Sequence, residues 1–273
     1  MDSSNHWYGH AHVLAEYCGL PAASPPPIQG ILQHGWTFVH GFGYGHRPPV
    51  GFTRFVWSDV NRRRGQIVGW RDYYVIGAPF AYLMAMTPEP DVMREGTIWY
   101  PFHGTADYEA VEGNHTALIE EILDTEDDPV TVCLYYVEFE QPEIRRMYED
   151  AGFRVISHGR RGAKWTGTTA NFLHQQLFEL RRHRRVASNR LSTAILYGLA
   201  TGCEAGVYGD PMQFMDGQPG FVGDDLLTAW FPEFHIPFID TGHGRDVAMR
   251  ELGCDSLLSP EELRLVVGWS GRG

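Results

Sequence analysis

The chain has 273 residues, which is enough for one large domain or two small ones. Apolar residues (43%) and charged residues (21%) lie in the range of folded globular proteins, which excludes a largely disordered chain. The formal net charge of −12 argues against a broad nucleic-acid-binding surface, so we expect no nucleic-acid partner. Local basic pockets for phosphate are compatible with this charge.

The first ninety residues carry weak structural signals. We expect a helix over residues 10–18 and short strands at 31–33, 55–57 and 74–76. The segment 87–96 is polar and contains two prolines, so we place a domain boundary there. The predicted lobes are therefore residues 1–92 and 93–273.

The rest of the chain alternates strand-length apolar runs with helix-period segments. Residues 130–136 are nearly all apolar or β-branched, which indicates a strand buried on both faces. The predicted strands are 97–101, 130–136, 153–157, 186–188 and 204–208, and the predicted helices between them are 114–123, 142–151, 170–184 and 191–201. This alternation predicts an α/β fold with a five-stranded parallel sheet and right-handed crossovers.

Several helix ends have local signals of their own. Asn114 is a predicted N-cap, Pro142 suits a first helical turn, and Gly152 suits a helix stop. The run Ser259-Pro260-Glu261-Glu262 combines an N-cap, a proline and a capping-box glutamate, which predicts a terminal helix through Val267.

Cysteine spacing and hydropathy bear on location. Cys18, Cys133, Cys203 and Cys254 form no CxxC pair and are irregularly spaced, so we expect neither a zinc site nor a disulfide framework. The sequence has no 18-residue apolar run and no apolar segment near Met1, so we predict no membrane span and no secretory signal. We expect reduced thiols in a cytoplasmic protein.

Ligands of open parallel sheets bind beyond the carboxyl ends of the strands. Polar and glycine residues follow each of the five predicted strands there: Phe102-His103-Gly104-Thr105, Glu138, His158-Gly159-Arg160-Arg161, Ser188-Asn189, and Gly209-Asp210. Because loops are generally polar, this gathering suggests a site without defining its ligand.

The sharpest element is the run from Ser188 to Ala194, where a predicted strand leads directly into a helix. The free N–H groups and positive dipole end of such a helix suit a diphosphate, and Ser188, Ser192 and Thr193 add hydroxyls. In the alternative, Ser188 or Asn189 only caps the helix.

Two further loops carry phosphate- or nucleoside-binding side chains. His103, Gly104 and Thr105 suit a tight turn whose amides bind phosphate, whereas His158-Gly159-Arg160 suits contact with a base, ribose or phosphate. Arg161 and Lys164 add positive charge beside the third strand.

Gln33-His34-Gly35-Trp36 is the corresponding element of the first lobe. Histidine is the usual general base near neutral pH, and Gly35 allows close approach of a ligand to the backbone. A purely structural histidine is the alternative.

The histidines and the basic run at 181–185 have plainer interpretations. We expect the basic run to be a solvated helix end, with contact to a membrane surface as the alternative. No metal site is predicted, since HExxH is absent and His10 and His12 diverge on a helix.

The segments quoted for His34 and for Ser188 to Ala194, together with Phe55-Val56-Trp57-Ser58 and Tyr74-Val75-Ile76-Gly77-Ala78-Pro79, resemble GT-B glycosyltransferases. The likeness is to bacterial surface-polysaccharide enzymes, including the sialyltransferase-like and glycerophosphotransferase-like branches. It implies two Rossmann-like lobes, a trimmed N-terminal acceptor lobe and a C-terminal nucleotide-donor lobe. It also implies a nucleotide-sugar substrate, a sugar, lipid-linked or small-molecule hydroxyl acceptor, and no cofactor.

The resemblance also implies roles for the candidate residues. His34 would be the catalytic base or an acceptor-site residue. The donor phosphates would bind His103, Gly104, Thr105, Ser188, Asn189, Ser192 and Thr193, and the nucleoside would bind His158, Gly159, Arg160, Glu138 and Asp210. Three alternatives stay open: a nucleotide-sugar epimerase, a polyol-phosphate transferase, and a non-catalytic nucleotide- or carbohydrate-binding subunit.

Overall fold

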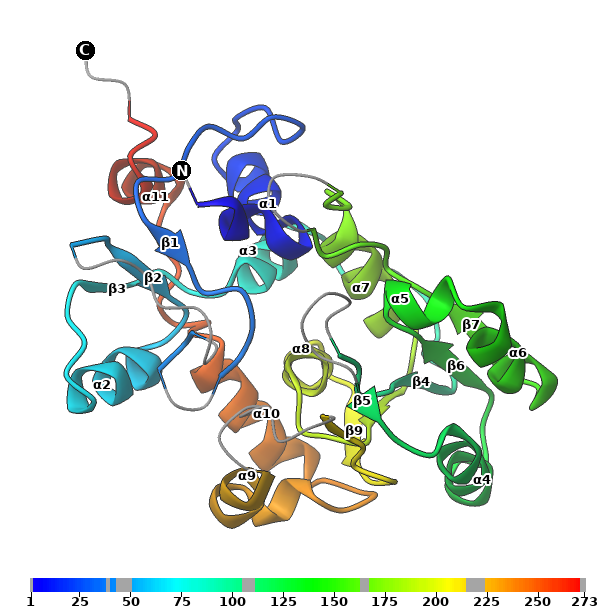
Figure 1. Ribbon diagram of the computed structural model, residues 1–273. Helices are drawn as coiled ribbons and strands as arrows, with labels where there is room; N and C mark the ends of the chain where they lie inside the picture. Colours follow the sequence, from blue (N-terminus) through cyan, green and yellow to red (C-terminus); the bar gives the residue numbers. More distant parts are fainter. Residues whose placement is uncertain are drawn as a thin grey trace. The chain divides into compact units, whose positions relative to one another are not determined.

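The structure is a computed structural model that describes residues 2–37, 40–42, 51–104, 111–162, 167–214 and 224–270 (Figure 1). The chain forms two compact units. The first unit comprises residues 1–89, 160–177 and 246–273, and the second comprises residues 90–159 and 178–245. Each unit has its own parallel sheet flanked by helices, which confirms the prediction of an α/β fold with two Rossmann-like lobes. The assignment of residues 1–92 to an acceptor and 93–273 to a donor stays a prediction.

The second unit is built on a five-stranded, fully parallel sheet. Its strands, in chain order, are β4 (Thr97–Tyr100), β6 (Val130–Cys133), β7 (Arg154–Ile156), β8 (Arg185–Ser188) and β9 (Glu204–Val207). The spatial order is β7-β6-β4-β8-β9, and Thr97 pairs with both Val130 and Arg185. The chain runs outward in opposite directions from β4 and β8, so a topological switch point lies between these two strands.

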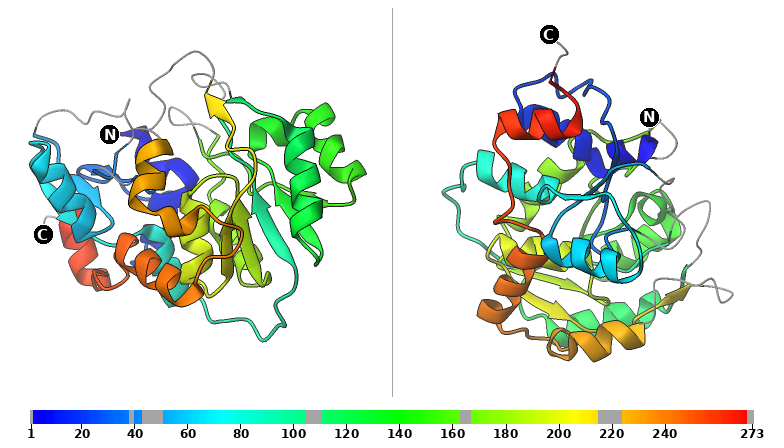
Figure 2. Two further views of the ribbon diagram at one scale, coloured as in Figure 1. Left: turned by 90° about the horizontal axis from the view of Figure 1, so that it is seen from below. Right: turned by 90° about the vertical axis from the view of Figure 1, so that its left-hand side faces the viewer.

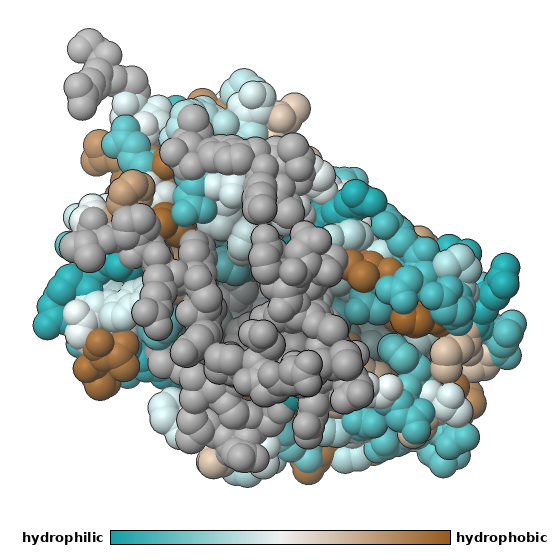
Figure 3. All heavy atoms as spheres, in the orientation of Figure 1, coloured by the Kyte–Doolittle hydropathy of each residue, from teal (hydrophilic) through white to brown (hydrophobic). Residues whose placement is uncertain are grey.

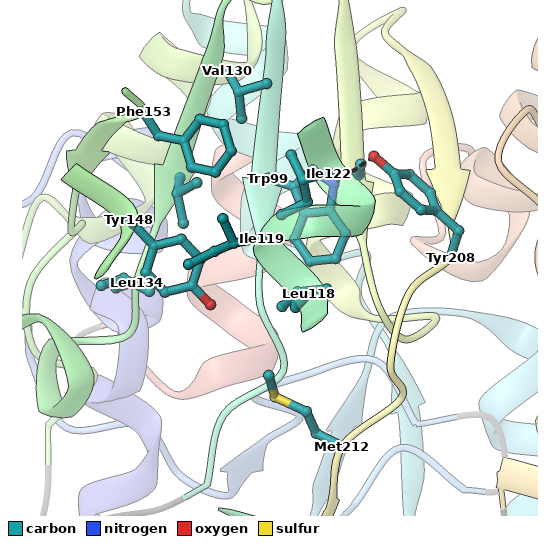
Figure 4. Close-up of a cluster of buried hydrophobic side chains, with 12 residues drawn as sticks. Trp99, Leu118, Ile119, Ile122, Val130, Leu134, Tyr148, Phe153, Tyr208 and Met212 are labelled. Carbon is teal, nitrogen blue, oxygen red and sulfur yellow. Dashed lines mark hydrogen bonds between the residues drawn. The ribbon is translucent and has the colours of Figure 1, made fainter. Parts of the chain in front are cut away.

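Helices cover both faces of this sheet. On one face, α4 (His115–Thr125) and α6 (Pro142–Asp150) pack Leu118, Ile122 and Tyr148 onto Trp99 and Val132 (Figure 4). The left view of Figure 2 shows the two helices together beside the strands. On the other face, α8 (Thr193–Ala200) packs against β8 and β9. The unit therefore holds its sheet between two layers of helices.

Gly198 of α8 packs closely against Val186 of β8. A Cβ atom at Gly198 would lie 2.2 Å from Cγ1 and 2.7 Å from Cβ of Val186, a β-branched side chain with little freedom in a strand.

We therefore expect Gly198→Ala to lower the free energy of unfolding by about 1–3 kcal/mol, despite the better helix propensity of alanine. Gly242 is a matched control, because it is also helical and its Cβ would approach nothing closer than Asp240 Oδ1 at 3.4 Å. Urea unfolding should show no loss for Gly242→Ala. Equal midpoints for the two variants would contradict the close packing of α8.

The first unit contains a three-stranded parallel sheet of order β1-β2-β3. Its elements are η1 (Ser3–Gly9), α1 (His10–Tyr17), β1 (Ile31–Leu32), β2 (Arg54–Val56), α2 (Asp59–Ile67), β3 (Tyr73–Val75), α3 (Pro79–Met86) and α11 (Pro260–Val267). Leu14 of α1 and Leu263 of α11 share a core with Phe55, so the end of the chain packs beside its beginning (Figure 1). Ser259 makes the predicted capping box with Glu262.

The remaining elements are short or connect the units. They are α5 (Tyr136–Phe139), α7 (Phe172–Leu180), α9 (Asp224–Trp230), η3 (Pro232–Phe234), α10 (Thr241–Glu251) and an antiparallel pair of β5 (Val111–Glu112) with β10 (Gln213–Phe214). Of the four boundaries between the units along the chain, two fall within α7 and α10, and the other two follow Glu89 and Gly159. All four cysteines are free thiols.

Two sequence predictions were wrong in their extent. The strand predicted over 130–136 ends at Cys133, because Tyr135 caps α5. The helix predicted over 170–184 ends at Leu180, so the basic run is not a solvated helix end. Arg181, His183 and Arg185 are buried, and only Arg182 and Arg184 are exposed.

Two buried residues of this run, Arg185 and His183, have partners within the second unit. Arg185 lies 3.4 Å from Glu126 and stacks over Phe238, and His183 Nε2 lies 3.0 Å from Thr131 Oγ1. The run therefore contributes to the core more than to a cationic surface.

The outer surface of α4 and α6 is largely hydrophilic, as the right-hand part of Figure 3 shows. Its exposed residues include Glu120, Glu121, Glu143, Arg146 and Glu149. Among the described residues, no helix has the length and apolar character needed to cross a membrane.

Candidate functional site

The loops that follow β4, β8 and β9 are tied together by one side chain, Asn189. Its Oδ1 accepts a hydrogen bond from the backbone N–H of Phe102 (2.7 Å), and its Nδ2 donates to the carbonyl of Asp210 (2.6 Å). Asn189 is only 4% exposed, so both bonds are shielded from water. The side chain of Asn189 thus fixes the loops around the switch point. Its contact with a donor phosphate stays a prediction.

The N-terminus of α8 lies directly after β8. Ser192 occupies the N-cap with extended backbone, yet its side chain makes no capping hydrogen bond. Its Oγ is buried and has no hydrogen-bond partner in the part of the chain that the structure describes. The N–H groups of the first helical turn, including those of Ala194 and Ile195, have no acceptors within the helix. Together with the helix dipole, these donors favour a bound anion.

Positive charge lies beside this helix start. The guanidinium of Arg190 stacks over the ring of Phe102 at 4.0 Å, which joins the loop after β8 to the loop after β4. Ser188 is buried, and its Oγ accepts a long hydrogen bond of 3.4 Å from the N–H of Arg190. We call Phe102, His103, Asn189, Arg190 and Ser192, with the start of α8, the switch-point site.

His103 is held in one orientation by two contacts. Its ring stacks on Tyr135 at 3.9 Å with 13° between the planes, and its Nδ1 lies 2.8 Å from the carbonyl of Gly104. Because a carbonyl only accepts, Nδ1 carries the proton of the neutral ring. The stack links the loops after β4 and β6. Thr105, the third predicted residue of this turn, lies outside the described residues.

His158 follows β7 and is buried. Its Nε2 lies 3.0 Å from the Tyr100 hydroxyl, and burial lowers the pKa of His158 to about 4. The ring is therefore neutral at physiological pH. Gly159 has a left-handed φ of +92°. Arg160 belongs to the first unit, where its N–H bonds to Thr169 Oγ1, so the predicted trio is divided between the units.

The two predicted acidic residues differ in environment. Asp210 uses its carboxylate on backbone, accepting from the N–H of Met212 at 2.9 Å. Glu138, in the first turn of α5, has a buried Oε2 that no described residue meets with a hydrogen bond. Burial raises the pKa of Glu138 to about 7. Glu138 can therefore exchange a proton near neutral pH, whereas Asp210 holds a loop.

In the first unit, Gln33 fixes the carboxyl ends of β1 and β2. Its Oε1 accepts from the N–H of Trp57 (3.0 Å), and its backbone carbonyl accepts from the Trp57 indole (3.1 Å). His34 follows and meets the ring of Trp7 edge to face at 4.4 Å. The guanidinium of Arg161 covers the same indole at 4.3 Å. His34 thus lies among aromatic and cationic groups of the first unit.

A buried acid supports the loop that carries His34. Glu251 is fully buried, and its Oε2 accepts from the indole N–H of Trp36 at 2.9 Å and lies 3.3 Å from Arg64. Glu251 was not predicted from the sequence, because its partner Trp36 is 215 residues away in the chain and no local pattern connects them. The ring contacts of Tyr135 and Phe102 were not predicted either.

The structure thus places most predicted donor-site residues along one sheet edge of the second unit. These are His103, Gly104, Glu138, His158, Gly159, Ser188, Asn189, Ser192, Thr193 and Asp210. His34 and Arg160 belong to the first unit. Within the described part of the chain, no three His, Cys, Asp or Glu side chains are grouped so as to hold a metal ion.

Comparison with known proteins yields little. No protein-family model matches the chain. No curated protein matches it either. Among solved structures, it is similar to the apo form of the lipopolysaccharide outer core galactosyltransferase WaaB, with a TM-score of 0.29 and 8% sequence identity. The match covers 79% of this chain and 57% of that chain, so this chain spans little more than half of that protein. This likeness is too distant to assign a family.

Proposed function

We propose that this chain transfers a sugar from a nucleotide-activated donor to a hydroxyl acceptor, and that the donor diphosphate binds at the switch-point site. One observation carries the proposal. At the switch point between β4 and β8, the start of α8 presents helix N–H groups and the buried Oγ of Ser192, which has no hydrogen-bond partner among the described residues. Open α/β sheets bind their ligands at this position.

The residues of the site support the charge changes of such a transfer. When the bond between the anomeric carbon and the phosphate oxygen breaks, negative charge develops on the departing phosphate. The dipole of α8 and the guanidinium of Arg190 stabilise that charge. The proposal assigns His34 as the base that takes the proton of the acceptor hydroxyl.

Thermal unfolding in the presence of nucleoside mono- and diphosphates and their sugars tests the donor site. A ligand at 100 times its Kd adds about 2.7 kcal/mol to the free energy of unfolding. Incubation of the bound donor with and without sugar acceptors then separates a transferase from an epimerase, which needs no acceptor. A folded protein that no nucleotide stabilises would contradict the proposal.

Ser192→Ala is expected to separate ligand binding from stability. The free energy of unfolding should change by less than about 0.5 kcal/mol, because Oγ has no hydrogen-bond partner among the described residues. Nucleotide affinity should fall about tenfold or more, because a hydrogen bond to a charged phosphate is lost. Calorimetric titration measures the nucleotide affinity, and urea unfolding measures the free energy of unfolding.

Ser259→Ala is the matched control for this variant. Ser259 caps α11 with a complete capping box, so its loss should cost about 1 kcal/mol of stability and leave nucleotide affinity unchanged. If Ser192→Ala loses stability and keeps its affinity, Ser192 acts as a cap and not as a ligand group.

A further inference from the structure

Glu138 lies along the sheet edge from the switch-point site. It is in α5, which follows the carboxyl end of β6. Because β6 pairs with β4 and β4 pairs with β8, Glu138 follows a strand two positions from β8, roughly 10 Å at the usual strand spacing. This spacing is comparable to the length of an extended sugar diphosphate.

The carboxyl group of Glu138 has an unused oxygen. Oε2 is buried and has no hydrogen-bond partner in the structure, and the side chain is in no ion pair among the described residues. A buried carboxylate without a partner is costly, so the group is stabilised either by a proton or by a ligand that supplies one. Its own backbone N–H is the stabilising contact that favours the ionised form.

The described side chain that interacts electrostatically with Glu138 is a phenol. Tyr148 of α6 shares the surroundings of Glu138, and the pKa of that phenol is raised by burial and then by the Glu138 charge. The Tyr148 hydroxyl lies 2.8 Å from Nδ1 of His115 on α4. Burial lowers the pKa of His115, so this ring is neutral at physiological pH. The Tyr148 phenol thus supplies no positive charge that would hold Glu138 in its ionised form.

We propose that Glu138 is an acid–base residue of this site, whose protonated carboxyl donates from Oε2 to a phosphate oxygen of the nucleotide-sugar donor. The inference rests on the proposed function. As the anomeric carbon–oxygen bond breaks, its electron pair passes to the phosphate oxygen, which takes the Glu138 proton. The acceptor oxygen bonds to the anomeric carbon, and in the net reaction its proton passes to water. Exchange with water restores the proton of Glu138.

Binding of inorganic pyrophosphate at pH 6 and pH 8 tests this role by calorimetry. In the wild-type protein the donating form of Glu138 is about tenfold less populated at pH 8 than at pH 6, because its pKa is about 7. Glu138→Gln keeps a donor of the same shape at both pH values. The ratio of the wild-type affinity to the Glu138→Gln affinity should fall about tenfold from pH 6 to pH 8. Because both proteins bind the same ligand, this ratio cancels the titration of pyrophosphate itself.

Glu143→Gln is the matched control, because Glu143 is exposed in the first turn of α6. It should show the wild-type dependence on pH. If Glu138→Gln also follows the wild type, Glu138 is not the donor, and the proposed function stands on nucleotide binding alone. If the folded wild-type protein binds neither pyrophosphate nor any nucleoside diphosphate at pH 6, the proposed function and this inference both fail.

Discussion

Asn189→Ala is expected to lower the free energy of unfolding by about 2–5 kcal/mol. The substitution removes the acceptor of the Phe102 N–H and the donor to the Asp210 carbonyl, which lie 2.7 and 2.6 Å from the Asn189 amide. Each of these groups is left without a partner in a shielded place, at a cost of about 1–3 kcal/mol. Urea unfolding followed by fluorescence measures the loss.

Two variants show whether the bridge itself is responsible. Asn189→Asp keeps the acceptor for Phe102 but places a second acceptor against the Asp210 carbonyl, so it should also be less stable than the wild type. Asn114 is the exposed N-cap of α4, and Asn114→Ala should cost only about 1 kcal/mol. A loss at Asn189 no greater than that at Asn114 would contradict its bridging role.

Glu138→Gln is expected to stabilise the protein by about 3 kcal/mol at pH 8 and to have little effect at pH 4. Burial raises the pKa of Glu138 from 4.5 to about 7 in the folded protein. The folded state therefore binds more protons than the unfolded state between these two values, and wild-type stability falls as the pH rises through this window. Above pH 7 the ionised Glu138 carboxylate destabilises the folded wild-type protein by the full amount of about 3 kcal/mol. The uncharged glutamine side chain of the variant has no such cost.

Urea unfolding of wild type and Glu138→Gln at intervals from pH 4 to pH 8 measures this difference. Glu143→Gln should parallel the wild type throughout, because that side chain is exposed. A constant difference between wild type and Glu138→Gln across the range would mean that the Glu138 carboxyl titrates normally.

Much of the fold follows from local patterns in the sequence. The apolar runs before Tyr100 and Ser188 form strands as predicted, and Asn114 and Ser259 cap helices as predicted, because each signal spans only a few residues. Where a run continued beyond its element, the prediction was wrong. Tyr135 and Tyr136 are apolar enough for a strand, but the chain turns into α5 at the sheet edge.

The candidate site was only partly predictable. Parallel strands bring their carboxyl ends to one edge, so the sequence indicated that Ser192 and Glu138 would share an edge. It could not indicate that the Ser192 hydroxyl has no partner or that Asn189 is occupied by backbone groups. Those properties come from contacts between distant segments, as does the burial of Glu251 against Trp36.

The most direct test of the donor site is amide NMR of the wild-type protein during titration with a panel of nucleoside diphosphates. The N–H groups at the start of α8 would bind the phosphates, so the signals of Ala194 and Ile195 should move first and most, together with that of Gly104. The same titration of Ser192→Ala should require higher ligand concentrations. Signals that move elsewhere in the chain, with those of Ala194 and Ile195 unchanged at saturation, would contradict the account.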